Sequence, residues 1–571
     1  MEYPFQRPLG ARPRDGGVEF RVWAPLPERV SVRVARRGEF PLEQRGYGIW
    51  DGVVEAGPGA DYHLVLDGRR HADPCSRFQP RGLRGSSRVV DPSAFEWTDS
   101  AWEGVALREL VVYELHVGTF TAEGTFEAIA PHVAGLRELG VTAIELMPVN
   151  EFPGVRGWGY DGVYLSAPHH AYGGPEGLRR LVDAAHSEGV AVILDVVYNH
   201  LGASGVRSFK AFGPYFSDHY ETDWGKAINY DGAWSDGVRE WAIQSACQWV
   251  RDYHVDGLRL DAVHAILDSS PRHLLEELAS RVRAERPGAL VIAETNRNDP
   301  RTLRPPEEGG YGQDAQWADD FHHSLRTLVT DEREGYYADF GRVSQLAKAF
   351  RRPFVYDGEW SESRRQRVGA EPFDRPPEQF VVCSQNHDQV GNRAFGDRMP
   401  REARPLAAFC TLLSPFTPML FMGEEYGEEA PFQFFTDHID KRIIRATREG
   451  RRKEFADFAA FAGEEVPDPQ SGETFERSKL TRRADPALAA LYRELLRVRR
   501  DLPHHDPDEV EFDEERRWLR VRRGPFELAC NFAREPASVP VAGGEVVLAT
   551  HDASMREGAV ALPALAGALL R

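Results

Sequence analysis

Charged and hydrogen-bonding residues follow several apolar runs of the sequence and could act together in acid and base chemistry. In chain order the set is Asp195, His200, Arg259, Asp261, Glu294, His387 and Asp388. If the apolar runs are parallel strands, their carboxyl ends meet at one edge and these side chains converge there. A single strand-end aspartate is typical of a helix cap. Several like charges in a water-poor cleft cost free energy, so the set as a whole indicates a functional site.

The residue types in this set favour cleavage of a glycosidic bond. A retaining glycosidase needs one carboxylate as nucleophile and one carboxylic acid as proton donor about 5 Å away, on either side of an oxocarbenium-like transition state. Asp261 suits the nucleophile, because Arg259 lies two residues earlier on the same strand, points to the same side and can hold it ionised. Glu294 suits the proton donor, because the apolar residues before it should raise its pKa.

The remaining residues of the set are expected to hold the sugar. Asp388 supplies a third carboxylate, which can stabilise positive charge that develops on the sugar ring. His200 and His387 can hydrogen-bond to ring hydroxyls without titrating. Tyr160, in the aromatic segment 157–161, offers a face on which a pyranose can stack.

The elements that position these residues follow from the apolar pattern. Eight apolar runs predict buried parallel strands, most of them separated by helical segments. The runs are residues 110–115, 141–147, 190–195, 255–261, 290–294, 315–320, 380–384 and 419–424. Eight strand and helix units fit a (β/α)8 TIM barrel with insertions, whose active site lies at the carboxyl ends of the strands. A doubly wound open sheet stays possible, although no G-x-G-x-x-G motif follows the first strand.

The two ends of the chain have a different pattern. Apolar and polar residues alternate in short runs such as 18–23 and 30–34, and again in 518–522 and 526–532. We therefore expect an α/β protein of three parts: an N-terminal β-sandwich over residues 1–95, a catalytic barrel over 96–500 and a C-terminal β-domain over 501–571.

Composition narrows the possible partners and the location. The chain has 571 residues, 42% of them apolar, which excludes disorder, and its formal net charge of −19 argues against nucleic acid as the main partner. Five cysteines without C-x-x-C spacing signal neither a disulfide framework nor a zinc site. The N-terminus lacks the pattern of a secretion signal, and prolines interrupt the long uncharged stretch 406–423, which should form a helix, a turn and a buried strand. We expect a cytoplasmic protein that does not act at a membrane.

Four segments resemble the four ordered sequence regions of glycoside hydrolase family 13, the α-amylase family. They are residues 195–200, 257–264, 292–295 and 386–388. The resemblance implies a TIM barrel with Asp261 as nucleophile, Glu294 as acid/base and Asp388 as transition-state stabiliser. It places four further residues in the subsite of the sugar being cleaved, namely Tyr160, His200, Arg259 and His387.

Further segments are similar to the trehalose-releasing branch of that family. They are residues 73–80, 293–301, 316–323, 332–340 and 431–438. This resemblance implies an immunoglobulin-like domain before the barrel and a β-sandwich after it. It also implies hydrolysis of the α-1,4 bond next to the terminal α,α-trehalose of maltooligosyltrehalose, releasing trehalose and a maltooligosaccharide, with maltooligosyltrehalose synthase as the pathway partner in trehalose biosynthesis.

The segment 431–438 follows the eighth predicted strand and should lie on the active-site face. Phe434 or Phe435 could stack on a sugar, and Asp437 or His438 could hydrogen-bond to its hydroxyls. The alternative is that the aromatic residues pack this long loop against the barrel.

Several points stay open at this level. We expect no metal and no cofactor, because no ligand cluster stands apart from the catalytic set and Asn199 lacks an oxygen-rich cage for calcium. Glu424 and Glu425 could reach the substrate or cap the loop after the last strand, whereas Glu114 is expected to be a core hydrogen-bonding group. The rival functions are a debranching or branching enzyme, a plain α-amylase and a non-catalytic glucan-binding protein, which would usually have lost a catalytic carboxylate.

Overall fold

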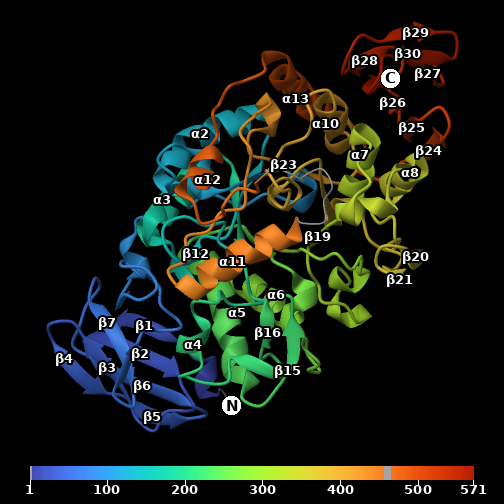
Figure 1. Ribbon diagram of the computed structural model, residues 1–571. Helices are drawn as coiled ribbons and strands as arrows, with labels where there is room; N and C mark the ends of the chain where they lie inside the picture. The colour runs from blue at the N-terminus through green and yellow to red at the C-terminus, as the bar shows by residue number, and fades with distance from the viewer. Residues whose placement is uncertain (1–2, 456–464) are drawn as a thin grey trace.

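Eight short parallel strands close into a barrel at the centre of the computed structural model, which describes residues 3–455 and 465–571 (Figure 1). In barrel order they are β10 (Val112–Leu115), β11 (Ala143–Leu146), β14 (Ala191–Val196), β17 (Gly257–Leu260), β18 (Leu290–Ala293), β19 (Ala315–Trp317), β22 (Phe380–Cys383) and β23 (Thr417–Phe421). Each strand lies within one of the eight predicted runs or overlaps it. Because β23 pairs with β10, the sheet is closed and the open-sheet alternative is excluded.

Apolar residues fill both sides of the barrel wall, as expected for parallel strands that are buried on both faces. Val112, Ala143 and Met419 belong to one buried cluster with other residues of the barrel strands. The wall also carries buried carboxylates, since Glu114 and Glu145 lie opposite each other on β10 and β11 and are each 1% exposed. The barrel therefore combines an apolar frame with ionisable side chains at its centre.

Helices cover the barrel wall. The longer helices are α2 (Phe126–Leu139), α3 (Gly174–Ser187), α5 (Ser235–Asp252), α6 (Leu274–Glu285), α7 (Asp319–Thr330), α8 (Val343–Arg351), α10 (Arg404–Leu412), α11 (Lys441–Glu454) and α13 (Pro486–Arg499). The uncharged stretch 406–423 forms most of α10, a turn and β23, as predicted. Within the described residues, no helix is both long and apolar enough to cross a membrane.

Short elements occupy the connections of the barrel. They are the hairpins β12 (Asn150–Glu151) with β13 (Tyr164–Pro168), β15 (Phe216–Thr222) with β16 (Gly225–Ile228) and β20 (Glu359–Ser361) with β21 (Gln366–Val368), and the helices α1 (Val117–Phe120), α4 (Val206–Phe209), α9 (His387–Gly391) and α12 (Gly472–Arg477). Single 3₁₀ turns lie among them, including η4 (His170–Tyr172), η8 (Gly335–Asp339) and η10 (Glu424–Tyr426).

Two β-domains flank the barrel at opposite ends of the molecule, blue and red in Figure 1. The N-terminal domain has two antiparallel sheets, with strands β1 (Gly10–Arg14), β2 (Gly17–Trp23), β6 (Ile49–Val54) and β5 (Glu43–Gly46) in one and β4 (Gly38–Pro41), β3 (Val30–Val34), β7 (Asp61–Leu66), β8 (Arg69–His71) and β9 (Ser87–Arg88) in the other. The C-terminal domain has a sheet of β24 (Glu509–Asp513), β25 (Trp518–Arg523), β26 (Phe526–Asn531), β31 (Ala566–Leu570) and β28 (Val546–Ala549), and a second sheet of β27 (Ala537–Pro540), β30 (Ala559–Leu562) and β29 (Ser554–Arg556). The predicted fold class is confirmed.

Side chains fix both β-domains to the barrel. Trp23 of β2 lies edge-on to Tyr215, with ring centroids 5.1 Å apart, and packs against Gly237 in the first turn of α5. At the other end, Arg523 of β25 donates to the carbonyl oxygen of Leu413 at 2.7 Å. Cys410 of α10 lies beside Cys530 of β26, with their sulfur atoms 3.8 Å apart. Both domains are thus joined to the barrel by buried contacts.

The contact between Trp23 and Gly237 gives a test of the N-terminal interface. A β-carbon at position 237 would overlap the indole ring of Trp23, so Gly237→Ala is expected to destabilise the protein by about 1 to 3 kcal/mol. Gly450 in α11 is the matched control, because nothing lies within 4 Å of a β-carbon there. Gly450→Ala should be neutral or slightly stabilising. Thermal unfolding of the two variants measures the difference, and equal melting temperatures would contradict the interface.

Candidate active site

A buried arginine ties together the carboxyl ends of β14 and β17. Arg259 is 0% exposed, and its Nη1 atom donates to both oxygens of Asp195, at 3.0 and 2.8 Å, and to Oδ1 of Asp261 at 2.9 Å. The guanidinium carbon also lies 4.2 Å from the ring centroid of Trp317 on β19. An unpaired buried cation is costly, so the two aspartates compensate the charge of Arg259. Burial outweighs the effect of the arginine on Asp195 and raises the pKa of Asp195 to about 6.

Asp261 is held from two further directions. Asn199 donates from Nδ2 to Oδ2 of Asp261 at 2.7 Å and to its carbonyl oxygen at 2.8 Å. The next residue, Ala262, has a positive φ of 39°, which is unusual for a residue other than glycine. Such strained backbone persists only where the surrounding structure holds it, and it often occurs at functional sites. The turn brings the chain from Asp261 directly toward Glu294.

Glu294 lies on the other side of this turn. Its Oε2 atom accepts a hydrogen bond from the backbone N–H of Ala262 at 2.6 Å and lies 3.7 Å from Nη2 of Arg259. Burial raises the pKa of Glu294 to about 8, in spite of the nearby arginine. At neutral pH, Glu294 is therefore mostly protonated, as a proton donor beside Asp261 must be.

A chain of hydrogen bonds crosses the site from β10. His387 donates from its backbone N–H to Glu114 at 2.8 Å, and its Nδ1 atom lies 2.5 Å from the same carboxylate. The Nε2 atom of His387 lies 2.7 Å from the hydroxyl of Tyr160, which donates to Asp195 at 2.6 Å. Burial opposes protonation of His387, but the carboxylates of Asp388 and Glu114 outweigh it and raise its pKa to about 9. Glu114 is thus a buried hydrogen-bonding group, as expected, although the sequence did not indicate its partner His387.

The predicted residue His200 also lies in this network. Its Nε2 atom is 2.9 Å from the carbonyl oxygen of Tyr160, and its Nδ1 atom contacts Asn199. Trp224, in the turn between β15 and β16, stacks on the imidazole at 5.1 Å between ring centroids and is 48% exposed. An exposed indole that stacks on His200 offers a surface for a sugar ring, and the sequence analysis did not identify it.

Asp388 is the least constrained of the three predicted carboxylates. It lies on the short helix α9, where Oδ1 accepts a hydrogen bond from Asn392 at 2.9 Å, and 41% of its side chain is exposed. A fourth carboxylate, Asp319, begins α7 directly after β19. Burial, followed by the charge of Asp388, raises the pKa of Asp319 to about 7. Asp319 was overlooked in the sequence, although its place after a strand was a usable signal.

A cavity of about 570 Å³ is lined by residues that follow the two carboxylates in the sequence. Val263 and Thr295, which line it, lie two residues after Asp261 and one after Glu294. Polar side chains from the β17 and β18 connections and from the β20–β21 hairpin complete the wall, including His264, Arg297, Tyr311, Arg364 and Arg367. The Nδ1 atom of His264 is buried without a hydrogen-bond partner. The wall of the cavity is therefore polar, and one of its residues has an unpartnered ring nitrogen.

The segment 431–438 buries Phe435, which the sequence analysis had considered as a stacking surface for a sugar. Phe435 is fully buried and lies edge-on to His116 at 5.2 Å, so the prediction that it could stack on a substrate is wrong. Asp437 accepts hydrogen bonds from Nη2 of Arg156 and from the backbone N–H of Val155, both at 2.9 Å. His438 lies with Nε2 3.7 Å from Asp161. Asp437 and His438 thus contact the loop that carries Tyr160, and their contact with a substrate stays a prediction.

The acidic pair after β23 is structural. Glu424 accepts hydrogen bonds from the backbone N–H of Phe421 at 3.1 Å and from Tyr492 at 3.1 Å, which favours the loop-capping alternative. Glu425 accepts from Tyr113 at 3.0 Å, so it too is engaged by the barrel wall.

One cluster away from the catalytic set has metal-ligand spacing, contrary to the sequence analysis. Glu151, His169 and His170 each place a possible ligand atom within 4.8 Å of the others. Hydrogen bonds account for the position of His169. The backbone N–H of Ala171 donates to Nδ1 of His169 at 3.1 Å, so the ring proton lies on Nε2. This Nε2 atom faces the carbonyl oxygen of Phe152 at 3.3 Å. In this arrangement both ring nitrogens of His169 face backbone groups of the protein.

The proton of Glu294 gives a direct test of this geometry. Since burial raises its pKa to about 8, Glu294 should stay protonated at neutral pH and ionise only as the pH rises through that value. Carbon-13 NMR of protein labelled at glutamate side-chain carboxyls can follow the titration, and Glu294→Gln identifies the signal. A midpoint near the value of an exposed glutamate, about 4.3, would contradict the burial of this proton donor.

Comparison with known proteins agrees with the three-part structure. Family models match residues 8–92 as carbohydrate-binding module 48 (isoamylase N-terminal domain), residues 90–227 as the alpha amylase catalytic domain and residues 509–569 as a domain of unknown function. A crystal structure from Salmonella typhimurium, described as a candidate alpha amylase, superposes with a TM-score of 0.91 at 39% identity and covers 98% of this chain and 99% of that chain.

Curated relatives match almost the whole length. The malto-oligosyltrehalose trehalohydrolase of Saccharolobus solfataricus is 44% identical over 90% of this chain and 91% of its own length. The enzyme of the same name from Rhizobium sp. is 45% identical over 98% of this chain and 99% of its own length. With these identities over nearly full-length chains, the protein belongs to the malto-oligosyltrehalose trehalohydrolase family, whose members here share the alpha amylase catalytic domain.

Proposed function

We propose that this protein hydrolyses the α-1,4-glucosidic bond next to the terminal α,α-trehalose unit of maltooligosyltrehalose, with retention of configuration. The observation that carries the proposal is the pairing of Asp261, held by Arg259, with Glu294 across one turn of chain. Burial raises the pKa of Glu294 to about 8, which suits a proton donor. The names of the relatives supply the substrate class.

Two steps follow from this pairing. In the first, a carboxylate oxygen of Asp261 forms a bond to the anomeric carbon of the glucose unit while the glycosidic bond breaks. Glu294 gives its proton to the departing oxygen, so trehalose leaves as a neutral molecule. In the second, Glu294 takes a proton from water, and the hydroxyl attacks the same carbon and frees Asp261. Two inversions give net retention.

The groups around the pair stabilise the charge that develops. The sugar becomes positively charged in the transition state, and the partly exposed carboxylate of Asp388 would offset that charge. Tyr160, His200 and His387 surround the expected position of the sugar ring, since all three join the network of Asp195 and Asp261. Arg259 keeps Asp261 oriented and lowers the cost of its negative charge.

The leaving unit should occupy the cavity beside Glu294. A general acid must lie within hydrogen-bond reach of the oxygen that it protonates, so the trehalose side of the substrate lies against Glu294. The polar cavity of about 570 Å³ begins at Thr295, the next residue, and has the size of a small-molecule site. We expect Asp437 and His438 to hydrogen-bond to the substrate from the side opposite this cavity. They also contact the loop that carries Tyr160.

The remaining assignments follow the same proposal. We divide the chain into an N-terminal β-sandwich (1–95), the catalytic barrel (96–500) and the C-terminal β-domain (501–571). All five cysteines are unpaired in the structure, which suits a reducing, cytoplasmic location. The substrate would come from maltooligosyltrehalose synthase, and no metal or cofactor takes part in either step.

The test is product analysis with a comparison of substrates. Incubation with maltooligosyltrehalose should release trehalose and a maltooligosaccharide whose new reducing end appears first as the α-anomer in proton NMR, because displacement by Asp261 is followed by a second inversion. Asp261→Asn and Glu294→Gln should each remove this activity while the far-ultraviolet circular dichroism stays unchanged.

Maltoheptaose and amylopectin serve as comparison substrates for the rival functions. Faster hydrolysis of maltoheptaose would favour a plain α-amylase, and attack at amylopectin branch points would favour a debranching enzyme. An initial β-anomer, or near-normal turnover in either variant, would contradict the proposed mechanism.

A further inference from the structure

We infer that Glu332 is a positioning residue for the reaction and acts through Arg393 to fix the helix that carries Asp388. The inference rests on the role proposed above for Asp388. It also gives a role to the segment 332–340, which resembles the trehalose-releasing branch of the family but contributes no group to the two steps of the reaction.

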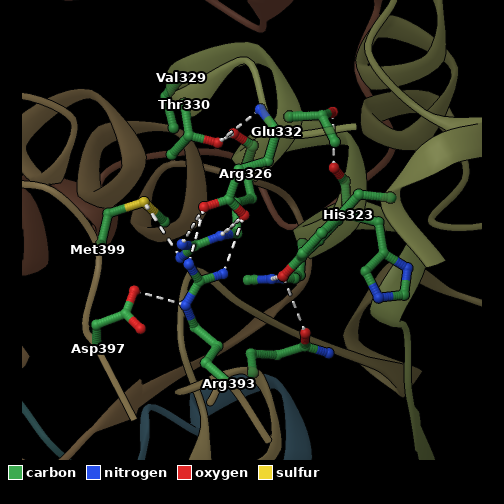
Figure 2. A network of polar contacts seen from close by, with 12 residues as sticks. His323, Arg326, Val329, Thr330, Glu332, Arg393, Asp397 and Met399 are labelled. Carbon is green, nitrogen blue, oxygen red and sulfur yellow. Dashed lines mark hydrogen bonds and ion pairs between the residues drawn. The ribbon is translucent and has the colours of Figure 1, made fainter. Parts of the chain in front are cut away.

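The carboxylate of Glu332 joins two parts of the chain (Figure 2). Both of its oxygens accept hydrogen bonds from Arg326 of α7, at 2.9 and 3.0 Å, and both accept from Arg393, at 3.0 Å each. Arg393 follows α9 by two residues and also donates from Nε to Asp397 at 2.7 Å. Two bidentate pairs on one carboxylate fix direction as well as distance.

Glu332 stays ionised over the whole range in which the protein would work. Burial opposes its ionisation, but Arg326 and Arg393 outweigh that effect and lower its pKa to about 2. The side chain of Arg326 is 1% exposed, so its guanidinium depends on this carboxylate for compensation. The contact is therefore a permanent link between α7 and the chain after α9.

Helix α9 needs such a link, because it has only five residues. At its start, His387 is fixed to Glu114 of β10 through both Nδ1 and the backbone N–H. At its end, the carbonyl oxygens of Gly391 and Arg393 accept hydrogen bonds from Arg451 of α11, at 3.1 and 2.9 Å. These contacts hold the backbone, whereas Glu332 holds the Arg393 side chain from the α7 side.

Asp388 lies between these two anchors, and its side chain contacts neighbours on the same short segment. The side chain is 41% exposed, and its Oδ1 atom accepts a hydrogen bond from Asn392 at 2.9 Å and lies 3.4 Å from Nε2 of His387. Its position in the cleft therefore follows the position of α9. A second contact supports the same face, since the hydroxyl of Tyr337 lies 3.0 Å from His322 and donates to Gln389, the neighbour of Asp388, at 3.4 Å.

The experiment compares Glu332→Gln with Asp331→Asn, a matched control one residue away. Asp331 pairs with Arg517 at 3.2 Å and Arg534 at 3.0 Å and so links α7 to the C-terminal domain. Glu332→Gln should lower kcat for maltooligosyltrehalose by about tenfold or more with little change in KM, because Asp388 acts in the transition state. Asp331→Asn should lower the melting temperature and leave kcat unchanged.

A double-mutant cycle separates positioning from general destabilisation. If Glu332 acts through Asp388, then Glu332→Gln should cause no further loss of single-turnover rate in an Asp388→Asn background. Additive losses, or an unchanged kcat in Glu332→Gln, would overturn the inference. Near-normal turnover in Asp388→Asn would contradict the proposed role of Asp388 in the reaction. Any loss of activity in Glu332→Gln would then have another cause, so the inference about Glu332 would be overturned as well.

A milder variant covers the case in which Glu332→Gln does not fold. Arg393→Lys keeps the positive charge but cannot form the bidentate pair, and 22% of the Arg393 side chain is exposed, so the change is tolerable. It should lower kcat in the same direction with KM unchanged and with no effect in the Asp388→Asn background. A wild-type kcat in folded Arg393→Lys would overturn the inference.

Discussion

The buried guanidinium of Arg259 is the interaction on which the site depends. A cation that is 0% exposed at the barrel centre must be compensated, and Asp195 and Asp261 supply that compensation at 2.8 to 3.0 Å. Burial and the neighbouring carboxylate of Asp261 raise the pKa of Glu294 to about 8, although Arg259 opposes them, so Glu294 keeps its proton at neutral pH. The division into nucleophile and proton donor therefore follows from one cation and its unequal distances to three carboxylates.

The barrel makes this arrangement possible because its frame does not adapt. Neighbouring strands β14, β17 and β18 place the carboxylates in register, and the strained turn at Ala262 closes the space between Asp261 and Glu294. The outer parts of the site are held less directly. Helix α9 is hydrogen-bonded at one end to Glu114 of the barrel and at the other to Arg451, next to the Glu332–Arg393 pair. These contacts fix the position of Asp388 relative to the barrel.

The sequence was sufficient for the strands and for the residues at their carboxyl ends, because both leave local patterns: apolar runs, and charged residues where the runs stop. It was not sufficient for contacts between distant positions. Glu114 and His387 are 273 residues apart, and nothing local to either residue indicates the other. Nor does local pattern distinguish an exposed aromatic from a buried one. Trp224 was therefore missed, and Phe435, which is fully buried, was taken as a possible platform for a sugar.

The central claim is that Asp261 forms a covalent bond to the sugar while Glu294 controls the proton. Mass spectrometry of Glu294→Gln after incubation with an α-maltosyl fluoride tests it most directly. Fluoride departs without an acid, but the second step lacks its base, so the intermediate should accumulate. The account predicts one maltosyl group on the peptide that contains Asp261. A group on another carboxylate, or no covalent adduct while substrate is consumed, would contradict it.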